Sequence, residues 1–108
     1  MIARLWTGYV PNEKAEEYVR LMGEIAIPDY KRISSNRGAF CLHRQLGPAT
    51  MVTMLTFWPD IEAIKQFAGE VYDTAKYYDF DRDFLLQIPE KAEHFEVIGN
   101  EFYGDAIT

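Results

Sequence analysis

Four stretches of the chain are rich in β-branched and aromatic residues and are typical of β-strands: residues 2–10, 39–46, 50–58 and 92–98. The stretch 50–58 is apolar nearly throughout and is followed by Pro59. In the stretch 2–10, large apolar side chains occur in both alternating sets, with Trp6 on one face and Tyr9 on the other. We expect such a strand to be covered on both faces.

Two further stretches have apolar residues at helical spacing. The first begins at Asn12, a favourable N-terminal cap. Its apolar positions are Ala15, Tyr18, Val19, Met22, Ile25 and Ala26. Because Pro28 lacks the N–H that a helix interior needs, the sequence predicts a break near Ile27, with Pro28 opening another turn. The second helix begins after Asp60 and runs over residues 61–68.

The strands at 39–46 and 50–58 are joined by Gly47-Pro48-Ala49, which predicts an antiparallel hairpin. With Leu46 opposite Thr50, the expected pairs are Arg44 with Val52, Leu42 with Met54 and Phe40 with Thr56. His43 and Cys41 then lie on the reverse face. A slip of one residue would exchange the two faces, and the sequence leaves both registers open.

The predicted order is β-α-β-β-α-β, which indicates a ferredoxin-like α+β fold with a four-stranded antiparallel sheet. We expect one domain over residues 1–108, with a core at 2–98 and a tail at 99–108 whose aromatic pair suggests docking. Two helices can cover only one face of this sheet. Leaving about five large apolar side chains of the other face in water would forfeit roughly 8–15 kcal/mol, as much as a typical domain's stability of about 5–15 kcal/mol. A homodimer with sheets packed face to face is therefore expected.

Charge and cysteine content narrow the classes of partner. The net charge of −6 argues against nucleic acid or an anionic membrane surface. Cys41 is the single cysteine, so no disulfide can form within the chain, and a small apolar filler is favoured over a nucleophile. No apolar run approaches transmembrane length, and the N-terminus lacks the shape of a signal peptide. These features suit the reducing cytoplasm.

A set of segments, in order along most of the chain, carries a family resemblance. They are residues 1–6, 21–30, 36–38, 57–69 and 75–78. Together they resemble the antibiotic biosynthesis monooxygenase (ABM) family of dimeric α+β barrel proteins. The resemblance implies a homodimer with a pocket in each protomer, between the sheet and the helices. It also implies oxygenation of a small aromatic, polycyclic phenol or quinone-like substrate by O₂, with no metal or other cofactor.

The resemblance also implies roles for individual residues. The expected catalytic residues are Tyr77, Trp6 and His43. The expected substrate-binding residues are Phe67, Tyr78, Arg4, Arg44 and Trp58. Plain core packing is the alternative for the aromatic residues, above all for Trp58 at a strand-to-helix corner.

Two other functions compete with the oxygenase. A haem-degrading branch of the family uses an Asn, a Trp and an axial His at places that hold Trp6, Phe67 and Tyr77 in this chain, and the missing histidine argues against haem. The second alternative is a non-catalytic dimeric ligand-binding or stress-response protein on the same scaffold, because a fold does not fix a function.

The sequence gives little support to a metal site. Asp79, Asp81 and Asp83 have the spacing that begins a calcium-binding loop, but the glycine at the sixth place is missing. The pattern therefore predicts a solvated acidic turn.

Overall fold

The structure is a computed structural model that describes residues 1–101, so most of the predicted docking tail lies outside the described residues. The strands are β1 (Ile2–Pro11), β2 (Gly38–Leu46), β3 (Ala49–Trp58) and β4 (Glu93–Glu96). The helical elements are α1 (Asn12–Leu21), the π-helical η1 (Met22–Ala26), α2 (Ile27–Lys31), α3 (Ile61–Ala68) and the 3₁₀ turn η2 (Asp81–Asp83). This order confirms the predicted α+β class.

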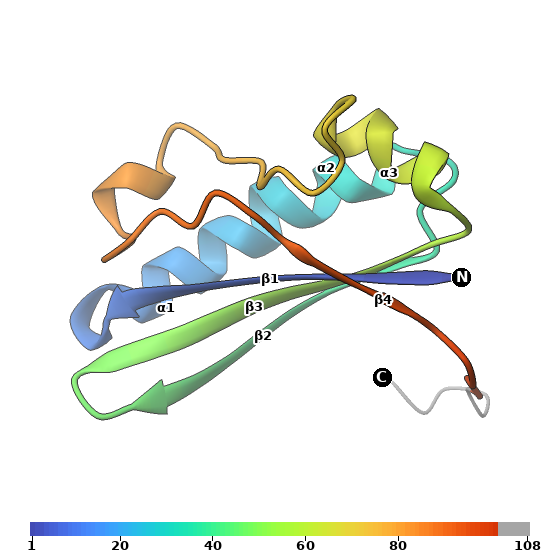
Figure 1. Cartoon of the computed structure of the whole chain (residues 1–108). Helices are drawn as coiled ribbons and strands as arrows, with labels where there is room; N and C mark the ends of the chain where they lie inside the picture. The colour runs from blue at the N-terminus through green and yellow to red at the C-terminus, as the bar shows by residue number, and fades with distance from the viewer. Residues whose placement is uncertain (102–108) are drawn as a thin grey trace.

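The four strands form one antiparallel sheet in the order β2-β3-β1-β4, which is compatible with the predicted ferredoxin-like plan. Figure 1 shows the helices on one face of the sheet, together with the long connection between α3 and β4. Val10, Val52 and Trp58 point from the sheet into this side and are fully buried. The main core of the protein therefore lies between the sheet and the helices.

Pro28 lies in the first turn of α2, as predicted, but the predicted break near Ile27 is a π turn and not an interruption of the helix. Residues 12–31 form one helical run, and the Ile27 N–H donates to the Met22 carbonyl five residues earlier. This wider π turn comes just before Pro28, where it gives the proline ring room beside the preceding carbonyls. The run therefore continues through α2, which places Asp29 and Tyr30 against the core.

The predicted hairpin register is wrong by one residue. Leu46 pairs with Ala49, so the loop consists of Gly47 and Pro48 alone. Gly47 has φ of 60°, a conformation that glycine adopts without strain and that a two-residue hairpin loop of this kind requires at its first position. As a result His43 pairs with Val52 on the helix side, and Arg44 points to the opposite face.

The N-terminal cap of α3 is confirmed. The Asp60 side chain accepts a hydrogen bond from the Ala63 backbone N–H at 2.9 Å. Ile64 and Phe67 are buried on the inner face of the helix, as the spacing predicts. The cap and this apolar face fix α3 against the end of β3.

The face of the sheet opposite the helices carries large apolar side chains. Leu42, Leu46, Tyr9 and Phe95 are between 40% and 51% exposed there. Their strand pairings place all of them on one face, away from the helices. None of the helices within residues 1–101 is long and apolar enough to cross a membrane.

Candidate functional site

A small cavity lies between the sheet, the helical run 12–31 and the connection after α3. Its lining residues are Arg4, Trp6, Met22, Tyr30, Met54, Phe67, Lys76, Tyr78 and Asp81. The cavity volume is about 20 Å³, which is room for roughly one water molecule at about 10–15 Å³ each. The sheet forms the floor, and residues 69–92, here called the cover segment, contribute the opposite wall.

Arg4 brings a positive charge to the cavity floor. It is only 3% exposed, and it sits on β1 between β3 and β4. Its guanidinium donates to the carbonyl oxygens of Tyr72 at 2.5 Å and Thr74 at 2.8 Å, both in the cover segment. Burial lowers the pKa of Arg4, but an arginine keeps its charge in a protein. One residue of β1 therefore fixes the cover segment to the sheet.

His94 is the third partner of Arg4, with 3.0 Å between its Nε2 and an Arg4 nitrogen. Because a guanidinium can only donate, Nε2 must accept, and the proton of the neutral ring sits on Nδ1. Burial and the nearby charge of Arg4 lower the pKa of His94. This histidine therefore resists protonation in the folded protein.

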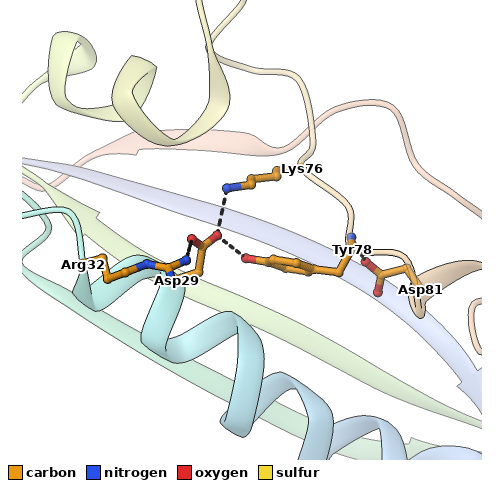
Figure 2. Close-up of polar contacts among 5 residues, drawn as sticks. All are labelled: Asp29, Arg32, Lys76, Tyr78 and Asp81. Carbon is orange, nitrogen blue, oxygen red and sulfur yellow. Dashed lines mark hydrogen bonds and ion pairs between the residues drawn. The ribbon is translucent and has the colours of Figure 1, made fainter.

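Asp29 on α2 anchors the other side of the cover segment, as Figure 2 shows. Its carboxylate accepts hydrogen bonds from the Tyr78 hydroxyl at 2.7 Å and from Lys76 Nζ at 2.8 Å. Arg32 donates to its other oxygen at 2.5 Å. Burial alone would raise the pKa of Asp29, but the hydrogen bonds from Lys76, Tyr78 and Arg32 lower it to about 2. The carboxylate is therefore ionised throughout the physiological range.

Asp81 is a second buried carboxylate at the cavity, and it is 3% exposed. One oxygen accepts from the Tyr18 hydroxyl at 2.7 Å, and the other accepts from the Tyr78 backbone N–H at 2.7 Å. Burial raises its pKa. The prediction of a solvated acidic turn is wrong for Asp81, because this carboxylate is buried and hydrogen-bonded to the hydroxyl of Tyr18, a buried residue of α1.

The aromatic wall of the cavity is built on Phe67. Tyr30 stacks on it with 4.4 Å between ring centroids, and Lys76 Nζ lies 4.6 Å from the centroid of Phe67. Every fully buried side-chain nitrogen or oxygen within residues 1–101 has a hydrogen-bond partner. The Tyr30 hydroxyl has no partner among the same residues and is therefore not fully buried, and Tyr30 is one of the residues that line the cavity.

The structure brings four of the predicted site residues together at the cavity: Arg4, Trp6, Phe67 and Tyr78. Tyr77 contacts this group through Trp6. The Tyr77 hydroxyl accepts a hydrogen bond from Trp6 Nε1 at 3.1 Å and donates one to the Pro89 carbonyl. It does not line the cavity.

The other three predicted site residues lie elsewhere. His43 and Arg44 are exposed on β2, beside a separate open groove against α1. Trp58 is fully buried, and its Nε1 donates to the Thr56 hydroxyl at 2.8 Å, which is the arrangement of a core residue.

Sequence reasoning missed four polar residues at or behind the cavity: Tyr30, Asp29, Lys76 and Asp81. Tyr30 and Asp29 lie within residues 21–30, and Lys76 lies within 75–78. Both segments belong to the family resemblance, which implies no role for these three side chains. Asp81 stands out in the sequence only for its spacing with Asp79 and Asp83, and its burial cannot be inferred because the cover segment has no periodic pattern.

Metal chemistry and thiol chemistry find little support at this site. Within residues 1–101, no group of three or more His, Cys, Asp or Glu side chains could hold a metal ion. Cys41 is half-buried on β2, and burial raises the pKa of its thiol, which lowers the fraction of reactive thiolate.

Comparison with protein-family models gives no match to this chain, and comparison with curated proteins gives none either. The arrangement of the side chains at the cavity is therefore the main evidence on function.

The neutral state of His94 predicts how stability changes with pH. The unfolded chain takes up a proton on this histidine near its ordinary pKa of 6.5, whereas the folded protein resists it. The free energy of unfolding should therefore fall as the pH drops below this value, by at most about 1.4 kcal/mol per pH unit. Urea titrations between about pH 7.5 and pH 5.5 measure it.

The matched variants for this test are His94→Gln, whose amide oxygen can still accept from Arg4, and His43→Gln on the exposed face of β2. The first should flatten the pH dependence and the second should preserve it. An equal fall in stability in wild type and His94→Gln would contradict the assignment.

Proposed function

We propose that this chain is an ABM-type protein whose cavity binds a small aromatic molecule, phenolic or quinone-like, and oxidises it with O₂ without a cofactor. The observation that carries the proposal is a cavity with aromatic walls and a buried carboxylate, Asp81, in its lining. A buried carboxylate with a raised pKa is a better proton acceptor than an exposed one. Trp6 and Phe67 offer flat apolar surface to an aromatic ring.

The reaction can be written for an anthrone-type CH₂ group. Asp81 accepts one C–H proton, and the resulting anion is electron-rich enough to reduce O₂ directly, which forms a C–O bond and a hydroperoxide. Loss of the second C–H proton breaks the O–O bond and leaves a carbonyl and water. The CH₂ group and one O₂ thus give one C=O and one H₂O, so that no external reductant is needed.

The cover segment must move for such a molecule to enter, because the cavity now holds roughly one water molecule. Lys76 and Tyr78 are the side chains of this segment that line the cavity and are tied to Asp29. Their displacement would enlarge the cavity without disturbing the sheet. We propose that ligand entry exchanges these contacts for contacts with the ligand.

We further propose that the protein is a cytoplasmic homodimer, paired through the open face of the sheet. Leu42, Leu46, Tyr9 and Phe95 supply the apolar surface that this pairing would bury. Packing of two such faces forms the dimeric α+β barrel that the resemblance implies. The cavity lies on the opposite face, so pairing leaves it accessible.

A non-catalytic ligand-binding protein is the second candidate. The small size of the cavity favours it, because a molecule held against a closed cover has little room for O₂ beside it. Binding without oxygen consumption would distinguish this candidate from the oxidase.

Asp81→Asn tests the oxidation. With anthrone and 1-naphthol as substrates, oxygen uptake by wild type should fall by about 10²–10⁴-fold in this variant, because the proton acceptor is removed. The asparagine can still accept from the Tyr78 N–H and donate to the Tyr18 hydroxyl, so the fold should survive. An oxygen electrode gives the rate, and circular dichroism monitors folding.

Asp83→Asn, an exposed position in the same turn, is the control and should keep the wild-type rate. If wild type binds these compounds but consumes no oxygen, the proposed oxidation is wrong and the binding protein takes its place.

Leu42→Glu tests the dimer. A carboxylate buried between the paired sheets would be unpaired, so the variant should sediment as a monomer at concentrations where wild type is a dimer. Ile25→Glu is the matched control, because Ile25 is 41% exposed on the helical side and Leu42 is 48% exposed on the sheet. A monomeric wild type, or a dimer in both variants, would refute this mode of pairing.

A further inference from the structure

Arg4 forms no direct ion pair in the described part of the chain. Burial lowers its pKa, and the carboxylate of Asp73 raises it only from a longer distance. Within residues 1–101, Arg4 has no acidic oxygen within 4 Å, although seven ion pairs form elsewhere on the same chain. Its partners are two carbonyl oxygens and a neutral histidine. A buried cation that lacks an anion is costly, and a ligand can remove this cost by supplying one.

Arg4 also keeps hydrogen-bond donors for such a ligand. A guanidinium has about five N–H donors, and the carbonyls of Tyr72 and Thr74 and the His94 ring occupy three of them. The Nε–H makes no hydrogen bond within residues 1–101, and no fully buried nitrogen there lacks a partner. The Nε–H is therefore not fully buried, and the cavity that Arg4 lines offers space for a ligand that accepts from it.

The other charged groups at the cavity do not compensate Arg4. Lys76 is a second cation in the lining, and its own partner is Asp29, which also pairs with Arg32 behind the cavity. Asp81 is the one carboxylate in the lining, and both of its oxygens already accept hydrogen bonds from tyrosine groups. The cavity is thus locally cationic in a chain whose net charge is −6.

Tyr30 completes the site. Tyr30 lines the cavity as Arg4 does, and its hydroxyl, which has no partner within residues 1–101, can donate to a ligand oxygen that also contacts Arg4. The stacked rings of Tyr30 and Phe67 provide a flat apolar wall beside these donors. A cationic donor, a neutral donor and an aromatic wall together fit an aromatic ring that bears one negatively charged oxygen group.

We propose that the cavity is an aromatic oxyanion site, in which a phenolate or aryl carboxylate places its charged oxygen against Arg4 and Tyr30. This inference rests on the cavity assigned under the proposed function and specifies its ligand. Binding of the anion requires no O₂, so experiments can refute the binding site and the oxidation independently.

The first test uses wild-type protein and 4-nitrophenol, whose ionised form absorbs visible light. The bound molecule should ionise at a lower pH than the free one, by about one pH unit or more, because at least tenfold preference for the anion shifts its ionisation by that amount. A spectrophotometric titration with and without protein measures the shift. An unchanged or higher ionisation pH of the bound molecule, or no binding, would overturn the inference.

The second test compares ligands of nearly the same shape by calorimetry. 4-Nitroanisole has the same ring as 4-nitrophenol but cannot ionise, and it should bind at least tenfold more weakly than the phenolate. 4-Nitrobenzoate carries a carboxylate in place of the phenolate oxygen. Whichever of 4-nitrobenzoate and 4-nitrophenolate binds more tightly identifies the oxygen group that the site prefers. Equal affinity for the ether and the phenolate would contradict the inference.

Substitutions of Arg4 and Tyr30 test whether these two side chains contact the charged oxygen of the ligand. Tyr30→Phe should weaken phenolate binding about 3–10-fold through loss of one donor, and Arg4→Lys should weaken it less than Arg4→Met, which removes the charge. Arg37→Met, at an exposed arginine outside the cavity, is the matched control and should bind as wild type. Because Arg4 also holds the cover segment, urea titrations check each variant, and Tyr30→Phe remains informative if the Arg4 variants unfold.

Oxygen uptake measured in the same solutions separates this inference from the proposed function. Anion-selective binding without oxygen consumption supports the oxyanion site and refutes the oxidation. Oxygen consumption by a protein that binds only the neutral form refutes the oxyanion site and leaves the oxidation standing.

Discussion

The buried guanidinium of Arg4 is the interaction on which the closed cavity depends. Its removal from water costs several kcal/mol, and the carbonyls of Tyr72 and Thr74 and the His94 ring recover part of this cost. The same contacts hold the cover segment over the sheet and connect it to the edge strand β4. Because none of these partners carries a negative charge, the geometry that closes the cavity also leaves it cationic.

The cover segment is held at its other side by Asp29, on the helical run that spans Pro28. Lys76 and Tyr78 therefore have two roles: they complete the cavity wall, and they tie the segment to α2. These ties are polar, and the cover segment also packs apolar side chains, among them Phe80 and Phe84, against the core of the sheet and helices. The cover segment contains little regular secondary structure beyond η2, and we propose local opening there as the route for a ligand.

The sequence predicts the strands and helices well because their apolar periodicity is strong. It predicts strand register and helix geometry poorly where these depend on the conformation of a single turn. The hairpin register depended on whether Ala49 belongs to the loop, and the π turn before Pro28 has no counterpart in a simple periodic pattern. The site shows the same limit. The family resemblance implies a role for Arg4 on a clear strand, whereas Asp81 lies in an aperiodic segment whose burial is set only by tertiary contacts.

Native-state hydrogen exchange of Asp29→Asn is the most direct measurement of this closure. The variant should speed exchange at the amides of Ala75, Tyr78 and Ala92 in the cover segment by about tenfold or more, for a loss of about 1.4 kcal/mol, while the amides of β1 and β3 keep their protection. Glu70→Gln, which removes an exposed ion pair with Lys65 in the same segment, should leave these rates nearly unchanged. Unchanged exchange of the cover segment in Asp29→Asn would show that Asp29 does not hold it closed.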